Sequence, residues 1–194
     1  MTELYLEDFE EGQSFGGSGR VRVDEERIKT FAAEFDPQPF HLDAGAARES
    51  IFGGLAASGW HTAALTMRLL VESELRPAGG IVGAGFDEFR WPRPVRPGDE
   101  LRVESEVLEV RPSKSRPDQG LIKVRTTTLN QSDEPVQISV GNLVVRRRSK
   151  YVCVFRRIWT AGHFAKGQSL RGRPRQFVVD TVVRHIVGVG SYQM

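Results

Sequence analysis

The sequence has a single cysteine among its 194 residues, Cys153, and no uninterrupted run of 18 apolar side chains. One cysteine excludes an internal disulfide framework and a cysteine-rich metal site. Without a long apolar run there is no candidate for a transmembrane helix, and no membrane partner is expected. Residues 1–12 are acidic and lack the basic-then-apolar order of a secretion signal, so a cytoplasmic location is expected.

Acidic side chains outnumber basic ones outside the C-terminal end of the chain. The formal net charge is +2, but residues 1–149 hold 19 Lys and Arg against 24 Asp and Glu. Residues 150–194 hold eight Lys and Arg and one acid, Asp180. Because the main body is mildly acidic, a nucleic-acid partner is not expected.

The basic C-terminal stretch, residues 149–194, has no clear hydrophobic period and adds no apolar face to a core. We therefore divide the chain into a folded domain, residues 1–148, and a basic C-terminal extension, residues 149–194, that is peripheral or poorly ordered. A tail of this kind is more often a solvated appendage than a binding arm. A segment foreign to the ancestral domain is a further alternative, and one sequence leaves these alternatives open.

The N-terminal half contains an amphipathic helix followed by a proline-rich loop. Apolar side chains recur with helical spacing over residues 28–35, after a group of acids that suits a helix N-terminus. Pro37 disfavours helical geometry in the residue before it, so this helix is expected to end at Asp36. Pro39 is expected to keep the next residues extended, and a short helix is predicted over residues 42–50.

The most apolar helical segment, residues 59–75, is apolar on almost every side in its first half. Ser58 stands directly before it and is a favourable N-cap. A helix of this composition must be buried on most sides, so we expect it to form the axis of the fold.

From residue 81 onward the hydrophobic period changes to the alternation that is typical of strands. Short polar turns separate the alternating segments, which favours antiparallel pairing. Residues 14–23 predict a further strand with a glycine-rich bend; no strand–loop–helix context follows that would make its glycines a phosphate-binding loop. The predicted fold class is α+β, with an antiparallel sheet wrapped on one long helix. The strands are expected at residues 81–91, 101–107, 121–130 and 136–148.

The proline-rich loop holds an acid and an imidazole, Asp36 and His41, five positions apart. Taken singly, each has an ordinary explanation as a turn or surface residue. Together they gain weight because the prolines stiffen the loop, and because the loop leads to a helix whose first turn has free N–H groups. An acid/base pair beside an anion-binding helix end is what proton chemistry next to an activated carbonyl needs. We therefore interpret Asp36 and His41 as catalytic.

Three segments, in this order, resemble the MaoC-like dehydratase family. DPQPFH at residues 36–41 is similar to the hydratase motif D-x-N-P-(aliphatic)-H. FGGLAASGWHTAAL at residues 52–65 is similar to a segment that ends in A-H-G, and FDEFRWPRPVRPGDEL at residues 86–101 resembles F-x-x-P-V-x-x-G-D. The resemblance covers roughly residues 5–147 and gives the C-terminal extension no counterpart.

This resemblance implies a single hot-dog domain, a curved antiparallel sheet wrapped around a long central helix, that forms a homodimer or higher homo-oligomer with sheets joined edge to edge. It also implies a hydro-lyase of fatty acid metabolism that adds water reversibly to a trans-2-enoyl-CoA, giving a (R)-3-hydroxyacyl-CoA. By this resemblance Asp36 and His41 activate the water, and the backbone N–H of Gly59 binds the thioester oxygen as enolate charge develops. No metal and no cofactor is implied beyond the coenzyme A that carries the substrate.

Three residues depart from the family pattern, and we count them as substrate-binding. Gln38 stands where Asn is usual but keeps an amide, and Phe40 stands where an aliphatic residue is usual and reshapes the acyl pocket. Ser58 replaces the His of A-H-G; it caps the helix but does not fill the space of a ring.

Two other functions share the predicted fold: a hot-dog acyl-CoA thioesterase and a non-catalytic acyl-CoA-binding or interaction domain. The intact pair of Asp36 and His41 favours the hydratase over both. No G-x-S-x-G motif surrounds Ser58, which excludes a serine-hydrolase elbow. His61 is expected to be a core or interface residue. Three arginines, Arg90, Arg93 and Arg96, are candidates to contact a coenzyme A phosphate.

Overall fold

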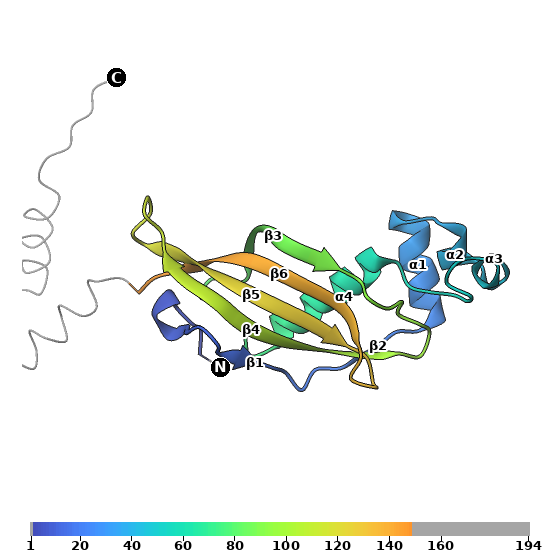
Figure 1. Ribbon diagram of the computed structural model, residues 1–194, viewed down its shortest axis with the longest axis horizontal. Helices are drawn as coiled ribbons and strands as arrows, with labels where there is room; N and C mark the ends of the chain where they lie inside the picture. Colours follow the sequence, from blue (N-terminus) through green and yellow to red (C-terminus); the bar gives the residue numbers. More distant parts are fainter. Residues whose placement is uncertain (1, 149–194) are drawn as a thin grey trace, which may run out of the picture. The chain divides into compact units, whose positions relative to one another are not determined.

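A computed structural model describes residues 2–148, in which an antiparallel sheet lies along one long helix (Figure 1). The spatial order of the strands is β1-β4-β5-β6-β3, and β2 pairs with the beginning of β4. Every pairing is antiparallel, as the short polar turns predict. The strands are β1 (Ser14–Phe15), β2 (Val21–Arg22), β3 (Val82–Arg90), β4 (Glu100–Pro112), β5 (Gln119–Leu129) and β6 (Pro135–Arg146).

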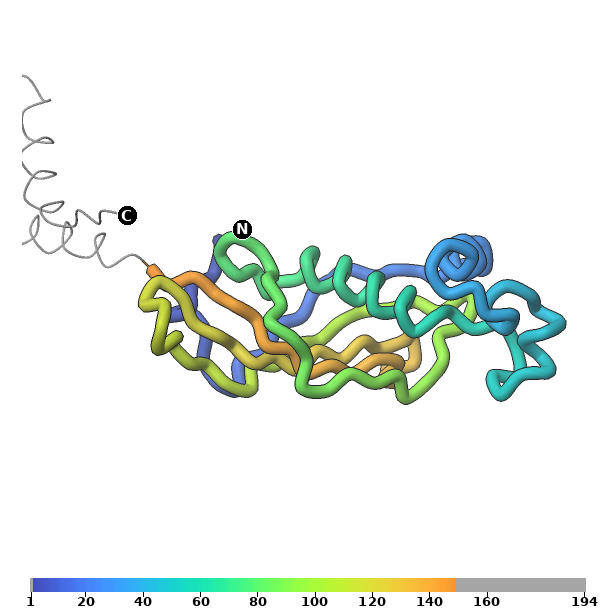
Figure 2. The backbone as a smooth tube through the Cα atoms, turned by 90° about the horizontal axis from the view of Figure 1, so that it is seen from above, coloured from blue at the N-terminus to red at the C-terminus, as the bar shows by residue number. Residues whose placement is uncertain are grey.

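The central helix is α4 (Gly59–Glu72), which runs along one face of the sheet (Figure 2). Ser58 is its N-cap, because the Ser58 hydroxyl accepts a hydrogen bond from the backbone N–H of Trp60 at 3.2 Å. The helix ends three residues before the predicted end. There the Ser73 hydroxyl donates to the Leu70 carbonyl and accepts from the Leu75 N–H, so a side chain replaces the next helical bonds.

One side of α4 remains uncovered, so the expectation that it is buried on most sides is only partly correct. Its sheet-facing residues are buried, among them Leu65, Leu69 and Leu70. Trp60 is 62% exposed, and Met67 and Val71 are exposed as well. The physical reason is that the neighbouring strand β3 lies at the edge of the sheet and leaves this side of the helix open.

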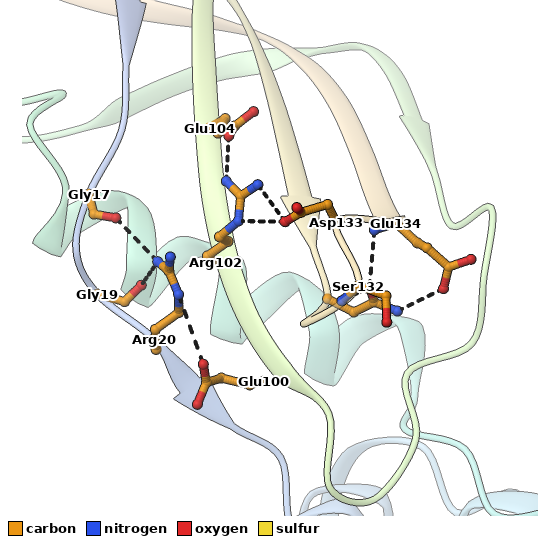
Figure 3. Close-up of polar contacts among 10 residues, drawn as sticks. Gly17, Gly19, Arg20, Glu100, Arg102, Glu104, Ser132, Asp133 and Glu134 are labelled. Carbon is orange, nitrogen blue, oxygen red and sulfur yellow. Dashed lines mark hydrogen bonds and ion pairs between the residues drawn. The ribbon is translucent and has the colours of Figure 1, made fainter.

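The N-terminal stretch forms two short strands where one bent strand was expected. β1 pairs with the middle of β4 and β2 with its start, so the glycine-rich residues between them cross from one part of β4 to another. Arg20 donates to the carbonyls of Gly17 and Gly19 and lies 3.9 Å from Glu100 (Figure 3). This loop is therefore occupied by the chain's own arginine.

Three short helices gather beside the start of α4: α1 (Glu25–Phe35), α2 (Pro39–Leu42) and α3 (Ala44–Arg48) (Figure 1). Asp24 caps α1 by accepting from the N–H of Arg27 at 2.8 Å. The expectation that Pro39 keeps the chain extended is wrong, since Pro39 is the first residue of α2. Proline suits that position because its φ is helical and its missing N–H is not needed there.

The sheet also carries polar side chains on the face toward α4. Ser105 of β4, Thr126 of β5 and Ser139 of β6 stand in register across three strands. Thr128 and Gln137 form a second row of this kind, and all five are buried. The core beneath the helix is therefore partly polar.

None of the helices in the part of the chain that the structure describes is long and apolar enough to cross a membrane. Over the same residues, no three His, Cys, Asp or Glu side chains are placed to bind a metal ion together. The predicted C-terminal extension, residues 149–194, lies outside the described residues.

Candidate active site

His41 lies on α2 and is 5% exposed. Its Nδ1 is 2.7 Å from the carbonyl oxygen of Ala56. Because a carbonyl can only accept, Nδ1 must carry the hydrogen, and in the neutral ring Nε2 is then left with its lone pair. The Phe40 ring meets the imidazole edge-on, with ring centroids 4.6 Å apart. These contacts fix both the plane of the imidazole and its tautomer.

Asp36 caps the C-terminus of α1 and turns its carboxylate toward His41. Its backbone N–H donates to the carbonyl of Ala32 at 2.9 Å, and its carbonyl accepts from the N–H of Gln38 at 2.7 Å. The Asp36 Oδ2 lies 3.5 Å from His41 Nε2, and the carboxylate side chain is 22% exposed. The pair is thus built on two short helices joined by Pro37.

Ser58 links the carboxylate to the central helix. Its hydroxyl donates to Asp36 Oδ2 at 2.6 Å while accepting from the N–H of Trp60. Ser58 is completely buried, so its hydroxyl orients Asp36 and does not meet solvent.

Gly59 begins α4 beside the acid/base pair. As the first residue of the helix, its N–H has no intrahelical acceptor, and it donates to no other atom within residues 2–148. The Trp91 ring packs directly against Gly59: a Cβ there would lie 2.8 Å from the indole. Glycine is therefore needed for the indole to approach the helix end.

Asp36, His41 and Gly59 line one cavity of about 360 Å³. The other predicted site residues lie elsewhere: Gln38 is exposed, and Phe40 packs behind His41 against the core. Ser58 is placed behind the cavity wall rather than on it. The remaining wall comes from residues 91–95, together with Phe52, Ala57, Trp60 and Thr62.

Two residues have places at the candidate site that the sequence did not indicate. Trp91 forms part of the cavity wall, and its indole N–H donates to Gln137 Oε1 at 3.0 Å. Arg96 does not line the cavity. Its guanidinium donates to the carbonyls of Phe52, Gly54 (2.6 Å) and Leu55 (3.1 Å). The W-P-R-P-V-R-P-G-D segment that carries both was noted for its family pattern and for Arg93 and Arg96 as candidate phosphate contacts, not for these contacts.

The Arg96 contacts hold the segment that positions His41. Residues 52–57 include the Ala56 carbonyl that fixes the imidazole, and the Ala57 N–H donates to the Val95 carbonyl at 2.8 Å. The Arg96 guanidinium therefore donates to carbonyls of its own chain, which argues against Arg96 as a candidate to contact a coenzyme A phosphate. Arg90 is paired with Glu88 at 2.6 Å, and Arg93, which lines the cavity, is paired with Glu134 at 3.3 Å.

His61 lies in the first turn of α4, as a buried residue stacked on Phe31. The ring centroids are 4.7 Å apart and the planes differ by 9°. Its Nδ1 is buried without a hydrogen-bond partner in the described part of the chain. Burial lowers the pKa of His61, and the nearby Arg27 lowers it further while Asp24 acts in the opposite direction. His61 does not line the cavity of the acid/base pair.

Comparison with known proteins decides the family. Residues 8–130 match the MaoC like domain, which is more than half of the chain. The chain belongs to the MaoC-like dehydratase family. The resemblance of the three sequence segments is thereby confirmed.

Solved structures of MaoC-like proteins share the fold. The MaoC-like dehydratase from Rhodospirillum rubrum is 60% identical, with a TM-score of 0.72 over 75% of this chain and 99% of that one. The R-hydratase PhaJ1 from Pseudomonas aeruginosa is 27% identical, with a TM-score of 0.58 over 75% of this chain and 88% of that one. The fold is therefore the hot-dog fold that the sequence predicts.

A further relative aligns with this chain over nearly all of its own length. The protein YdeM of Bacillus subtilis (strain 168) is 34% identical over 142 residues, which cover 73% of this chain and 97% of YdeM.

Proposed function

We propose that this MaoC-like protein is an acyl-thioester hydratase/dehydratase that adds water reversibly to a trans-2-enoyl-CoA and forms a (R)-3-hydroxyacyl-CoA. The observation that carries the proposal is the shared cavity of Asp36, His41 and the Gly59 N–H. The likeness to an R-hydratase supports the stereochemistry, and the coenzyme A carrier follows from the family resemblance.

The pair is arranged to hold one water molecule. His41 Nε2 and Asp36 Oδ2 are both hydrogen-bond acceptors, and at 3.5 Å they share no hydrogen of their own when the imidazole is neutral. A water that donates one hydrogen to each relieves their repulsion. Both of its hydrogens then point at the pair, so its lone pairs face the cavity, where the substrate binds.

In the hydration direction, the water oxygen attacks C3 of the enoyl group as the pair removes one of its protons. The π electrons move toward the thioester carbonyl, and C2 then takes up a proton from the same site. One water is consumed, with its hydroxyl on C3 and a hydrogen on C2. Such positioned proton transfer contributes about a hundredfold to ten-thousandfold in rate.

The Gly59 N–H is the donor for the charge that develops on the thioester oxygen. It stands at a helix N-terminus, where the helix dipole adds to the hydrogen bond. Donors fixed in advance at such a position act strongly because they need no reorganisation during the reaction.

We also propose a homodimer that covers the open side of α4. Val82 is 53% exposed and Phe86 59% exposed on the edge strand β3, next to the uncovered Trp60 and Met67 of α4. An unpaired edge strand beside an apolar surface is a template for pairing with a second copy. Size-exclusion chromatography with light scattering is expected to give the mass of a dimer or higher homo-oligomer for the wild type. Phe86→Glu is expected to give the mass of a monomer. A monomeric wild type contradicts the proposal.

Hydration is tested spectrophotometrically with crotonyl-CoA and longer trans-2-enoyl-CoAs. The expected result is loss of the conjugated-thioester absorbance without release of free thiol. Asp36→Asn keeps the size of the side chain and an acceptor for Ser58 but removes the charge, and we expect a fall of about a thousandfold in kcat. Asp43→Asn is the matched control, since Asp43 only caps α3 by accepting from the N–H of Ala46.

Each alternative function has its own signature in this assay. Release of free thiol identifies a thioesterase, and binding of acyl-CoA without any turnover identifies a non-catalytic domain. Full activity of Asp36→Asn refutes the mechanism for every substrate tried.

A further inference from the structure

A second cavity, of about 250 Å³, lies between α4 and β3. Its rim is apolar and includes Met67 and Phe86. Trp60 lines both this cavity and the cavity of the acid/base pair, so the two are neighbours across one indole ring. The volume is small compared with the roughly 300–1,000 Å³ of most ligand sites, which suits a short group.

Two polar side chains, Gln137 and Ser139, are among the residues of this second cavity, whose lining is mostly apolar. Gln137 and Ser139 stand two positions apart on β6 and so point to the same face of the sheet. Both line the cavity, and they are 2% and 5% exposed. Two neighbouring hydroxyls are already paired within the core, Thr126 with Ser105 at 3.2 Å and Thr66 with Thr128 at 2.7 Å.

The bond to Trp91 fixes which way the Gln137 amide faces. An indole N–H can only donate, so the atom of Gln137 that lies 3.0 Å from it must be the amide oxygen. The NH₂ group is then the end left for another partner. Within residues 2–148, neither this NH₂ group nor the Ser139 hydroxyl is in a hydrogen bond. Both residues line the cavity, so these two groups can donate there to a ligand that supplies an acceptor.

We propose that this cavity binds the far end of the substrate's acyl group, and that the acyl group carries a neutral oxygen, a ketone or a hydroxyl, that accepts from Gln137 and Ser139. The inference rests on the proposed function and names the substrate class for it. No charged side chain lines the cavity. A carboxylate there would be a buried charge without a partner, whereas a neutral oxygen needs only the two donors.

The test compares two saturated acyl-CoAs that differ in one oxygen, 5-oxohexanoyl-CoA and hexanoyl-CoA. Neither can be hydrated, so calorimetric titration of the full chain measures binding without turnover. We expect the ketone to bind about tenfold more tightly. Ser139→Ala should reduce that preference to about twofold or less and leave the affinity for hexanoyl-CoA unchanged.

Gln137→Leu should reduce the preference for the ketone in the same way. If the Gln137 variant does not fold, Ser139→Ala still tests the inference, because it removes only one oxygen atom. Thr127→Val is the control, because it removes a hydroxyl of the same sheet that does not line the cavity. Its preference for the ketone should equal that of the wild type.

Three results overturn the inference: equal affinity for the two ligands, tighter binding of hexanoyl-CoA, or a preference that Ser139→Ala leaves intact. Tighter binding of glutaryl-CoA than of the ketone overturns the assignment of a neutral oxygen. The outcome is separable from the proposed function. Hydration of enoyl-CoAs without a preference for the ketone would support the proposed function and refute the inference. A preference for the ketone without hydration would support the ketone site and refute the proposed function.

Discussion

The Ser58 hydroxyl donates to the Asp36 carboxylate at 2.6 Å, although 22 positions separate the two residues in the sequence. The same hydroxyl accepts from the Trp60 N–H and so begins α4. One side chain therefore ties the acid of the candidate active site to the helix end that carries the Gly59 N–H. The acid and the oxyanion donor are held as one unit, which is how a site keeps the narrow geometry that catalysis needs.

Removing that link should impair activity and stability together. Ser58→Ala deletes a hydrogen bond to a charged group, worth about 1.5–3 kcal/mol, and we expect kcat to fall about tenfold to a hundredfold. Loss of the cap should lower the free energy of unfolding by about 1–2 kcal/mol. Enzyme assays and urea unfolding measure the two effects.

Ser73→Ala separates those effects, because Ser73 holds the other end of the same helix through its hydroxyl. It should lose stability with little change in kcat. Equal activity of Ser58→Ala and Ser73→Ala would contradict the role given to Ser58.

Gly59→Ala should lower both activity and stability, because the added Cβ would clash with a neighbouring ring. Alanine normally stabilises a helix relative to glycine by about 1 kcal/mol. Here the added Cβ would lie 2.8 Å from the Trp91 ring, so the indole must move and its bond to Gln137 is disturbed. We expect kcat/KM to fall at least about tenfold and the melting temperature to drop.

A double-mutant cycle with Trp91→Ala tests this cause. Removing the indole removes the clash, so adding Gly59→Ala to Trp91→Ala should cost little stability or increase it. If the losses of stability in the two single variants added up in the double variant, the clash between the Cβ and the indole would not be the cause.

The parts of the fold that depend on local pattern could be predicted from the sequence. The period of the apolar residues and the position of Ser58 predict α4, and the alternation after residue 80 predicts the long strands. Two of the failures have different causes. Pro39 begins a helix instead of preventing one, and the side of α4 at Trp60 is open because β3 is an edge strand. Periodicity reports which residues are apolar but not what covers them.

For the candidate site, the spacing of Asp36 and His41 indicated two of its groups, because residues five positions apart across two prolines stay near each other. The Ser58–Asp36 bond, the Trp91 wall and the Arg96 contacts could not be foreseen. Each joins segments more than 20 positions apart, and their meeting depends on how one loop docks on another.

Arg96→Met should loosen the segment that fixes His41. The substitution leaves the carbonyls of residues 52, 54 and 55 without their donors, and we expect the free energy of unfolding to fall by about 2–4 kcal/mol. The Ala56 carbonyl belongs to the same segment, so kcat should fall as well. Urea unfolding and the hydration assay check both.

Arg96→Lys should be intermediate, because an ammonium group cannot reproduce the planar fork of a guanidinium. Arg93→Met is the control: Arg93 forms an exposed ion pair with Glu134, and such pairs contribute about 0–1 kcal/mol. If Arg93→Met lowered the free energy of unfolding as much as Arg96→Met, the role of the three carbonyls would be refuted.

His61 should make the protein less stable as the pH falls. Burial holds its pKa below the ordinary value of 6.5, with a further contribution from Arg27 that Asp24 opposes. The unfolded chain therefore binds a proton below about pH 6.5 that the folded chain does not yet bind, and the unfolding free energy decreases. Above that pH both states are neutral at His61, and its contribution is constant.

His61→Phe keeps an aromatic ring against Phe31 and removes the titrating group. We expect the drop in melting temperature between pH 7.5 and pH 5.5 to be smaller in this variant than in the wild type. Because all other titratable groups are common to both proteins, the difference between the two drops isolates His61. An equal drop in both proteins would contradict this prediction. The acid sensitivity would then arise from groups other than His61.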